Sequence, residues 1–181
     1  MKGHITIPYP KPSFVNQLVL NLTLAGSQSD FVRNHVNIIP ASVKDMTGKK
    51  SIYVIHSQGG RVGWNVNPEN VAAIVAIEPG GAPEIGSEQY KTLLAANIPI
   101  VMYFGDYIDN GPEDIQSTSF WKSVRDGAVA FAESYNKDGG NCTVVNLPDV
   151  GITGNSHFMF QEKNSEEIAQ HVENWIKENV K

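Results

Sequence analysis

The chain is poor in cysteine, in long apolar runs and in clustered basic residues, and each shortage argues against certain kinds of site or binding partner. Cys142 is the single cysteine, so an internal disulfide is excluded and a thiol nucleophile or a thiolate metal site has little support. No apolar run approaches the roughly 18 residues that a membrane span needs. The net charge is −5 at pH 7 without a basic cluster, so nucleic acid and anionic membranes are not expected partners.

The first residues lack the apolar core of a secretory signal. The chain begins Met1-Lys2-Gly3-His4, without the basic and then apolar stretches that direct a protein to export. The sequence as given therefore predicts a cytoplasmic protein. A secreted or periplasmic protein is the alternative if the chain is a processed product or an upstream segment is missing.

What is present is typical of one folded domain. The 181 residues are 41% hydrophobic and 18% charged, an ordinary composition for a chain long enough to bury a core. We expect a single domain over 1–181, with an irregular lead-in at 1–50 and the regular elements at 51–181. Within the lead-in, 31–39 is expected to be helical until Pro40 ends it, and 41–46 to form a second short helix.

The stretch at 51–60, Ser-Ile-Tyr-Val-Ile-His-Ser-Gln-Gly-Gly, organises the rest. Its β-branched and aromatic start is typical of a buried strand, and a glycine-rich turn follows it. A strand, a sharp turn with a serine at its apex and then a helix form a nucleophile elbow. Ser57 is thus the candidate nucleophile, and the backbone N–H of Gln58 is the candidate oxyanion donor. Ile55 stands where glycine is usual, so its neighbours must accommodate a β-branched side chain.

The remaining segments predict alternating strands and helices. Buried strands are expected at 71–77, 98–104 and 142–147, and helices at 61–66, at 87–96, at 119–137 and after an N-cap at Asn164. The order predicts an α/β fold, a parallel sheet with helices on both faces. One apolar stripe of the long helix is expected to be core: Phe120, Trp121, Val124, Ala128, Phe131, Ala132 and Tyr135.

Five polar residues each follow a predicted strand: Ser57, Glu78, Asp106, Asp109 and His157. Because the carboxyl ends of parallel strands share one edge of a sheet, we expect these side chains to converge there. Acyl transfer by serine needs a base and an acid that orients the base. The chain order serine, acid, histidine makes His157 the candidate base.

The acid is a choice between neighbouring strands. The usual position follows the strand after next from the elbow, where Asp106 and Asp109 stand, whereas Glu78 follows the very next strand. Neighbouring strands lie about 4.8 Å apart, so a longer carboxylate one strand over reaches a similar point. We favour Glu78 for its buried approach and rigid Pro79-Gly80 setting. Asp109 is the alternative, and Asp106 is interpreted as a former of the turn.

Four segments resemble a small group of esterases with the α/β-hydrolase fold. They are His-Ser-Gln-Gly at 56–59, Ile-Val-Ala-Ile-Glu-Pro-Gly at 74–80, Ile-Pro-Ile-Val-Met-Tyr-Phe-Gly-Asp at 98–106 and Gly-Ile-Thr-Gly-Asn-Ser-His-Phe-Met-Phe-Gln-Glu-Lys-Asn at 151–164. The resemblance implies a Ser57–Glu78–His157 triad with the glutamate after the sixth strand of the family fold. It also implies a carboxylesterase that acts on a small-molecule ester without metal or organic cofactor, and a dimer among the expected assemblies.

The resemblance covers roughly 35–180, the C-terminal part of that fold. Only about fifty residues precede the elbow strand, and they contain no glycine-rich loop to supply a second oxyanion donor. Losing one such donor typically lowers turnover about 100–1,000-fold. A binding or assembly protein that keeps the triad residues as relics is therefore a rival function, and an acyltransferase or amidase on the same triad is another.

The substrate-binding side chains are the least defined part of the prediction. Candidates to line an acyl or alcohol pocket are His56, Trp64, Phe158, Met159 and Phe160. Each of the apolar ones also suits an ordinary core position.

Overall fold

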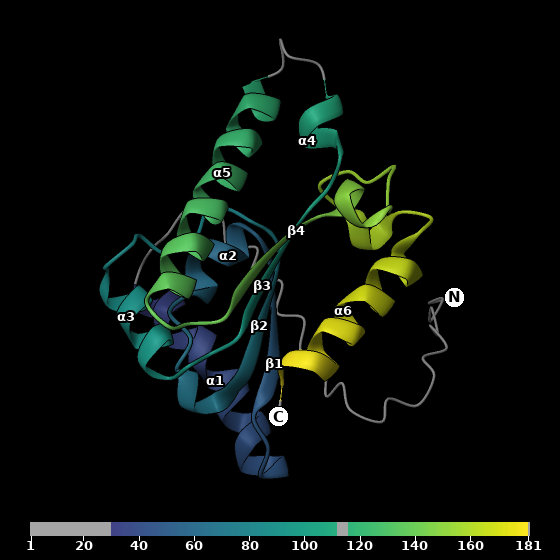
Figure 1. Cartoon of the computed structure of the whole chain (residues 1–181). Coiled ribbons are helices and arrows are strands. Elements are labelled where there is room, and N and C mark those ends of the chain that lie inside the picture. The colour runs from purple at the N-terminus through teal and green to yellow at the C-terminus, as the bar shows by residue number, and fades with distance from the viewer. Residues whose placement is uncertain (1–29, 112–115, 181) are drawn as a thin grey trace.

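The computed structural model describes residues 30–111 and 116–180 (Figure 1). The part of the predicted lead-in at 1–29 lies outside these residues. The described chain contains a four-stranded parallel sheet in the order β1-β2-β3-β4. Its strands are β1 (Ser51–Ser57), β2 (Val71–Pro79), β3 (Ile100–Phe104) and β4 (Cys142–Asn146). The predicted α/β fold and its strands are confirmed, with bounds that differ by one or two residues.

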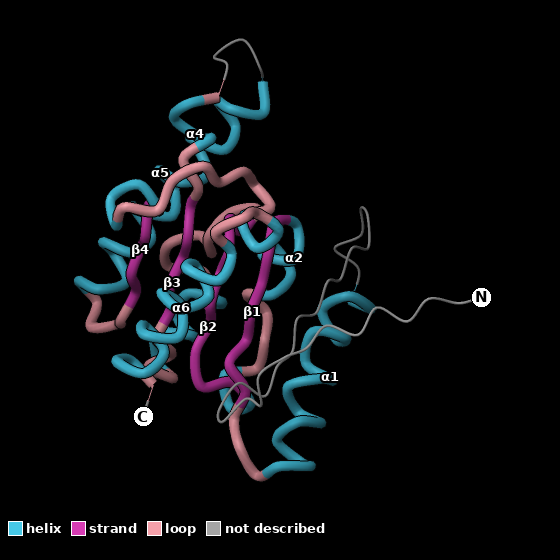
Figure 2. Tube along the Cα trace, turned by 90° about the vertical axis from the view of Figure 1, so that its right-hand side faces the viewer, coloured by secondary structure: helices cyan, strands magenta, loops and turns pink. Residues whose placement is uncertain are grey.

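Helices cover both faces of this sheet (Figures 1 and 2). One face packs against α2 (Gln58–Gly63), α3 (Glu88–Ala95) and α5 (Gln116–Lys137), and the other against α6 (Ser165–Asn179). Short elements lie in the connections between the strands and helices: α4 (Tyr107–Asn110) and the 3-10 helices η1 (Pro68–Asn70), η2 (Leu147–Val150) and η3 (Met159–Gln161). None of the helices in the described ranges is long and apolar enough to cross a membrane.

Alternation along the strands divides the core into two apolar clusters. Ile74, Ile100 and Met102 face the α2, α3 and α5 side, whereas Val75 and Val101 face α6. All five are fully buried. Consecutive residues of a strand point to opposite faces, so continuous apolar runs are what a sheet covered on both faces requires.

The helix α1 (Asp30–Thr47) overturns the expectation that Pro40 ends a helix. A proline inside a helix removes one backbone hydrogen bond. Here Pro40 is buried one turn after Val36, which is also buried, and α1 packs against β1 and α2. Burial of this apolar face offsets the lost hydrogen bond, and the helix continues through the proline.

The apolar stripe of α5 is only partly core, contrary to the prediction. Ala128, Phe131 and Tyr135 are buried, but Phe120 is 44% exposed. Trp121 is half-buried. The first turns of α5 rise beyond the sheet in Figure 1, so the stripe there faces the carboxyl ends of the strands instead of their flat surface.

Candidate active site

Ser57 occupies a strained turn between β1 and α2. Its backbone has φ 51° and ψ −127°, a left-handed conformation that strains a non-glycine residue by about 1–3 kcal/mol and persists only when its surroundings impose it. Two contacts impose it. The Gly80 N–H donates to the Ser57 carbonyl at 2.7 Å, and Gly60 packs so closely on β2 that a Cβ there would lie 2.6 Å from the Cβ of Pro79.

The polar groups of this turn are available for chemistry. The Ser57 side chain makes no capping hydrogen bond with α2. Gln58 is the first residue of that helix, and the N–H groups of a helix's first turn have no acceptor within the helix. The turn therefore places the Ser57 hydroxyl and the Gln58 backbone N–H next to each other at the carboxyl end of the sheet, and their roles as nucleophile and oxyanion donor stay predictions.

Glu78 lies at an irregularity in the neighbouring strand. His56 pairs with Ile77, but Ser57 pairs with Pro79, so Glu78 is an extra residue in β2. Its φ is 39°. Such bulges bend a strand and re-aim a side chain, and they are frequent beside active sites. The bulge explains how a glutamate at the end of an apolar strand reaches its neighbours at the sheet edge.

The Glu78 carboxylate is fully buried, and both oxygens are hydrogen-bonded. The Gly105 N–H donates to Oε1 at 2.7 Å. Oε2 accepts from the Tyr107 hydroxyl at 2.8 Å and lies 2.6 Å from Nδ1 of His157. Burying a carboxylate is unfavourable unless its oxygens are paired. The three donors supply that pairing and fix the direction of the carboxylate.

The His157 ring is oriented by its contact with Glu78. A carboxylate oxygen accepts, so the short contact assigns the proton to Nδ1 and leaves Nε2 to act as a base. The half-buried ring lies 4.2 Å from the Trp121 ring and 4.6 Å from the His56 ring, measured between centroids. The structure thus brings Glu78 and His157 together at the edge that carries Ser57.

His56 links the serine turn to the histidine loop. In the described part of the chain no hydrogen bond joins the Ser57 hydroxyl to the His157 ring. Instead Nε2 of His56, the residue before Ser57, lies 3.0 Å from the His157 carbonyl oxygen. The carbonyl accepts, so Nε2 carries a proton. Burial lowers the pKa of His56, although that hydrogen bond opposes the shift.

The loop that carries His157 is fastened by Asp106, directly after β3. Its carboxylate accepts the N–H groups of Gly154 at 3.0 Å and Asn155 at 2.7 Å. Burial alone would raise the pKa of Asp106, but the hydrogen bonds from Asn155 and Gly154 outweigh it and lower the pKa. Asp106 is a turn former, as interpreted from the sequence, and it also holds the loop of the candidate base.

The side chain of Asn164, at the N-cap of α6, bonds to the same loop and not to the helix. Its side chain exchanges two hydrogen bonds with the Asn155 amide, at 2.8 and 3.1 Å, and donates to the Thr153 carbonyl at 3.0 Å. Asn164 is the N-cap residue of α6, as predicted, and its carbonyl accepts from the Glu167 N–H at 3.0 Å, but its side chain makes no cap hydrogen bond with the helix. Ser156 and Glu162 also bond each other. The histidine loop is thus tied internally as well as to β3.

Asp109, the alternative acid, faces α5. Its carboxylate pairs with both terminal nitrogens of Arg125, at 2.5 and 2.8 Å. These hydrogen bonds lower the pKa of Asp109. Neither Asp109 nor Asp106 hydrogen-bonds the His157 ring within the described residues, and Glu78 does. The geometry favours Glu78 as the acid.

The substrate-lining candidates divide into core and surface. Trp64 is 4% exposed, with its indole N–H donating to the Gly81 carbonyl at 2.7 Å, and Met159 is fully buried in the α6 cluster. These two are core. Phe158 and Phe160 are 49% and 40% exposed, and both rings contact the half-buried His56. Aromatic surface therefore lies beside His157.

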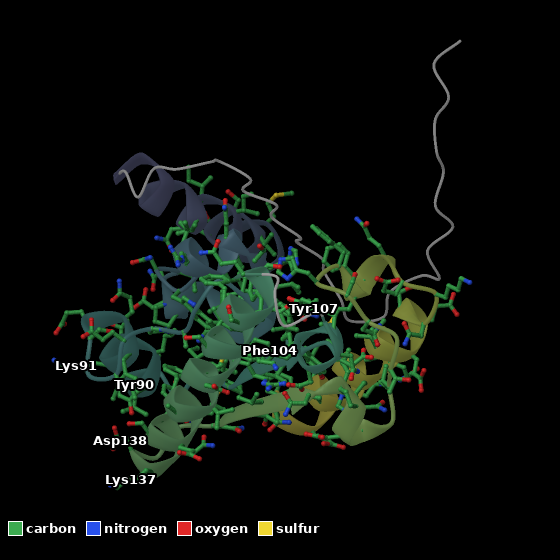
Figure 3. All side chains as sticks on the ribbon, turned by 90° about the horizontal axis from the view of Figure 1, so that it is seen from above. Tyr90, Lys91, Phe104, Tyr107, Lys137 and Asp138 are labelled. Carbon is green, nitrogen blue, oxygen red and sulfur yellow. The ribbon has the colours of Figure 1, made fainter. Side chains whose placement is uncertain are left out.

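Two neighbours of the site escaped the sequence analysis. Tyr107 lies between Asp106 and Asp109 in the sequence and belongs to no recognisable motif. The helical spacing of Trp121 predicts a core position. Figure 3 looks down on the carboxyl edge of the sheet: Tyr107 lies toward the middle, while Tyr90 and Asp138 lie at the periphery. The position of Tyr107 three residues after the end of β3, at the carboxyl edge of the sheet, was the available signal.

Metal ligation has no candidate in the described ranges. Among residues 30–111 and 116–180, no group of three or more histidine, cysteine, aspartate or glutamate side chains is placed to hold a metal ion. Cys142 is buried in β4, and burial raises the pKa of its thiol to about 12.

Known proteins similar to this chain include a lipase and an esterase. No family model matches the sequence. The chain is similar to a probable secreted lipase, phiG, of a fungal species (strain ATCC 74256), with 29% identity over 164 residues that cover 68% of this chain and 45% of the lipase. It is also similar to the structure of a bacterial esterase, with a TM-score of 0.68 and 30% identity over 81% of this chain and 43% of the esterase.

The parallel sheet and the serine turn at its carboxyl edge define an α/β-hydrolase-like fold. Within that class, the chain is similar to a bacterial esterase and to a probable secreted lipase. The chain spans less than half the length of each of these two relatives.

Proposed function

We propose that this chain carries the catalytic residues of a carboxylesterase-like serine hydrolase. The observation that carries the proposal is the 2.6 Å contact between His157 Nδ1 and the buried Glu78 carboxylate, at the sheet edge that presents Ser57 in a strained turn. The similarity to a bacterial esterase and to a probable secreted lipase supports the same reaction class.

The reaction would begin with attack of the Ser57 oxygen on the ester carbonyl carbon. His157 Nε2 takes the hydroxyl proton, and Glu78 holds the opposite ring nitrogen and stabilises the imidazolium. When the tetrahedral intermediate collapses, the imidazolium gives its proton to the leaving alcohol, and the acyl group stays on Ser57. Water then attacks the acyl-enzyme by the same sequence, which releases the carboxylic acid and restores the serine.

The oxyanion and the substrate would be held by groups around the serine turn. The backbone N–H of Gln58 is the proposed donor to the developing oxyanion, because it begins α2 and adjoins the nucleophile. The exposed rings of Phe158 and Phe160 lie beside His56. An ester with an apolar acyl or alcohol group would bury its chain against these rings.

The first test is labelling of the chain with a fluorophosphonate probe beside a Ser57→Ala control. The proposal expects labelling that the substitution abolishes, together with hydrolysis of short p-nitrophenyl esters. A folded sample that takes up no probe would overturn the proposal for this chain and favour the binding or assembly role. Labelling without ester turnover would direct the search to amide or acyl-acceptor substrates.

A further inference from the structure

Tyr107 makes two contacts that join the candidate acid to the loop of the candidate base. Its hydroxyl donates to Oε2 of Glu78 at 2.8 Å, and its backbone N–H donates to the Asn155 carbonyl at 3.2 Å. Asn155 stands two residues before His157. A single residue therefore fastens both partners of the Glu78–His157 pair.

We propose that Tyr107 is a positioning residue for the acid, and that its hydroxyl shares Glu78 Oε2 with His157 so that the carboxylate stays ionised and correctly aimed. The inference rests on the proposed function for its catalytic meaning. The geometry itself does not depend on that function, because the folded chain contains both contacts with Glu78 Oε2 whatever reaction it catalyses.

The burial of Glu78 is the reason that a second donor matters. The carboxylate has no exposed surface, so protein groups replace its hydration. The Gly105 N–H occupies Oε1, which leaves Oε2 to both His157 and Tyr107. A hydrogen bond to a carboxylate stabilises its charge and lowers its affinity for a proton. The Tyr107 hydrogen bond thereby favours the arrangement in which the proton between His157 Nδ1 and Glu78 Oε2 stays on the imidazole.

Tyr107 stays a donor under any working condition of such an enzyme. Burial, then the negative charge of Glu78 and the hydrogen bond to it, raise the pKa of Tyr107. Tyr107 is the first residue of α4, three residues after β3 ends, and lies between Asp106 and Asp109 at the usual position of the acid. Here this segment supplies a neutral donor to a glutamate from the neighbouring strand.

The groups around the His157 ring come from four elements. Glu78 reaches it from β2, Tyr107 from α4 and His56 from β1, while the uncharged Trp121 of α5 covers the ring. Glu78 is the acidic group among them, and His56 is the other imidazole beside His157. Removal of the Tyr107 hydroxyl thus removes its hydrogen bond to Glu78 and leaves the other contacts of the His157 ring in place.

The test replaces the hydroxyl and follows His157 directly. In Tyr107→Phe, the midpoint of an NMR titration of the His157 ring should move upward by about one pH unit. The reason is that the Glu78 carboxylate, without the tyrosine hydrogen bond, is more basic and holds the imidazolium more tightly. Site-specific 3,5-difluorotyrosine at 107, a stronger donor, should move it downward. Tyr103→Phe is the matched control, since that buried hydroxyl contacts a different histidine, His171, at 2.9 Å, and it should leave His157 unchanged.

Activity supplies the second measurement. The acid limb of kcat/KM in Tyr107→Phe should move upward with the His157 midpoint, with kcat lowered by about tenfold or less and KM nearly constant. An unmoved midpoint in both Tyr107 variants, or one that moves equally in Tyr103→Phe, would overturn the inference. If the midpoint moves in a chain that takes up no fluorophosphonate, the proposed function fails while the positioning by Tyr107 stands.

Discussion

Ile55 and Gly63 fit together as a pair across the β1–α2 turn. A Cβ built on Gly63 would lie 2.6 Å from Cγ2 of Ile55 and 3.3 Å from the Tyr53 ring. Both residues at this contact are buried. The branched side chain of Ile55 therefore occupies the space that any larger residue at 63 would need, and the close approach of α2 to β1 depends on this glycine.

A methyl group at Gly63 should destabilise the fold. We expect Gly63→Ala to lower the free energy of unfolding by about 1–3 kcal/mol, because overpacking in a closed core forces neighbours to move. Ile55→Ala alone should also destabilise the fold, but it should cost less when it is added to Gly63→Ala, because the new methyl group fills part of the space that it opens. Gly127→Ala is the control, since Gly127 lies in α5 with nothing within 4 Å of its built Cβ, and alanine favours a helix. Urea unfolding of the four variants checks this, and equal stability of Gly63→Ala and Gly127→Ala would contradict it.

Removing the charge of Glu78 should lower activity far more than removing that of Asp109. We expect Glu78→Gln to reduce kcat by up to about 10⁴-fold, because an amide cannot stabilise the imidazolium or hold the required tautomer. Asp109→Asn disturbs a half-exposed ion pair with Arg125 and should leave kcat within about threefold. Ester hydrolysis and fluorophosphonate labelling rates measure both. The reverse ranking would assign the acid to the loop after β3.

The sequence predicted the parts of this site that depend on order and periodicity. Apolar runs located the four strands, and the parallel arrangement placed Ser57, Glu78 and His157 at one edge. The choice of Glu78 over Asp109 came from the setting of each carboxylate. Glu78 is the carboxylate that lies at hydrogen-bond distance from the His157 ring, and its role as the acid stays a prediction.

Features that depend on three-dimensional packing were not accessible in this way. Tyr107 reaches Glu78 only because a bulge re-aims the carboxylate toward α4, and no local pattern encodes that meeting. Trp121 has the spacing of a core residue, but the start of α5 lies beside His157. Pro40 breaks isolated helices, yet the packing of α1 against β1 and α2 outweighs that tendency.

Asp106 should control the order of the loop that presents His157. In Asp106→Asn, an NH2 group, which cannot accept a hydrogen bond, replaces one carboxylate oxygen. The N–H groups of Gly154 and Asn155 thereby lose a charged partner. Hydrogen bonds to charged groups contribute about 1.5–3 kcal/mol, and we expect protection of these two amides from hydrogen exchange to fall about ten- to a hundredfold. Asp149→Asn, in an exposed contact with Asn146, is the control and should leave both amides protected.

The same carboxylate sets an acid limit for the loop. The hydrogen bonds lower the pKa of Asp106 in the folded chain below its usual value, so the folded state binds this proton less readily than the unfolded state does. The stabilisation by Asp106 is therefore complete above the unfolded pKa of about 3.9 and is lost as the pH falls through the lower folded value. Exchange of the Gly154 and Asn155 amides should be insensitive to this group from pH 5 to 8. If protection of these amides already declines between pH 7 and 5 in the wild-type chain but not in Asp106→Asn, the carboxylate is not held as the structure has it, and the loop of His157 is anchored by other contacts.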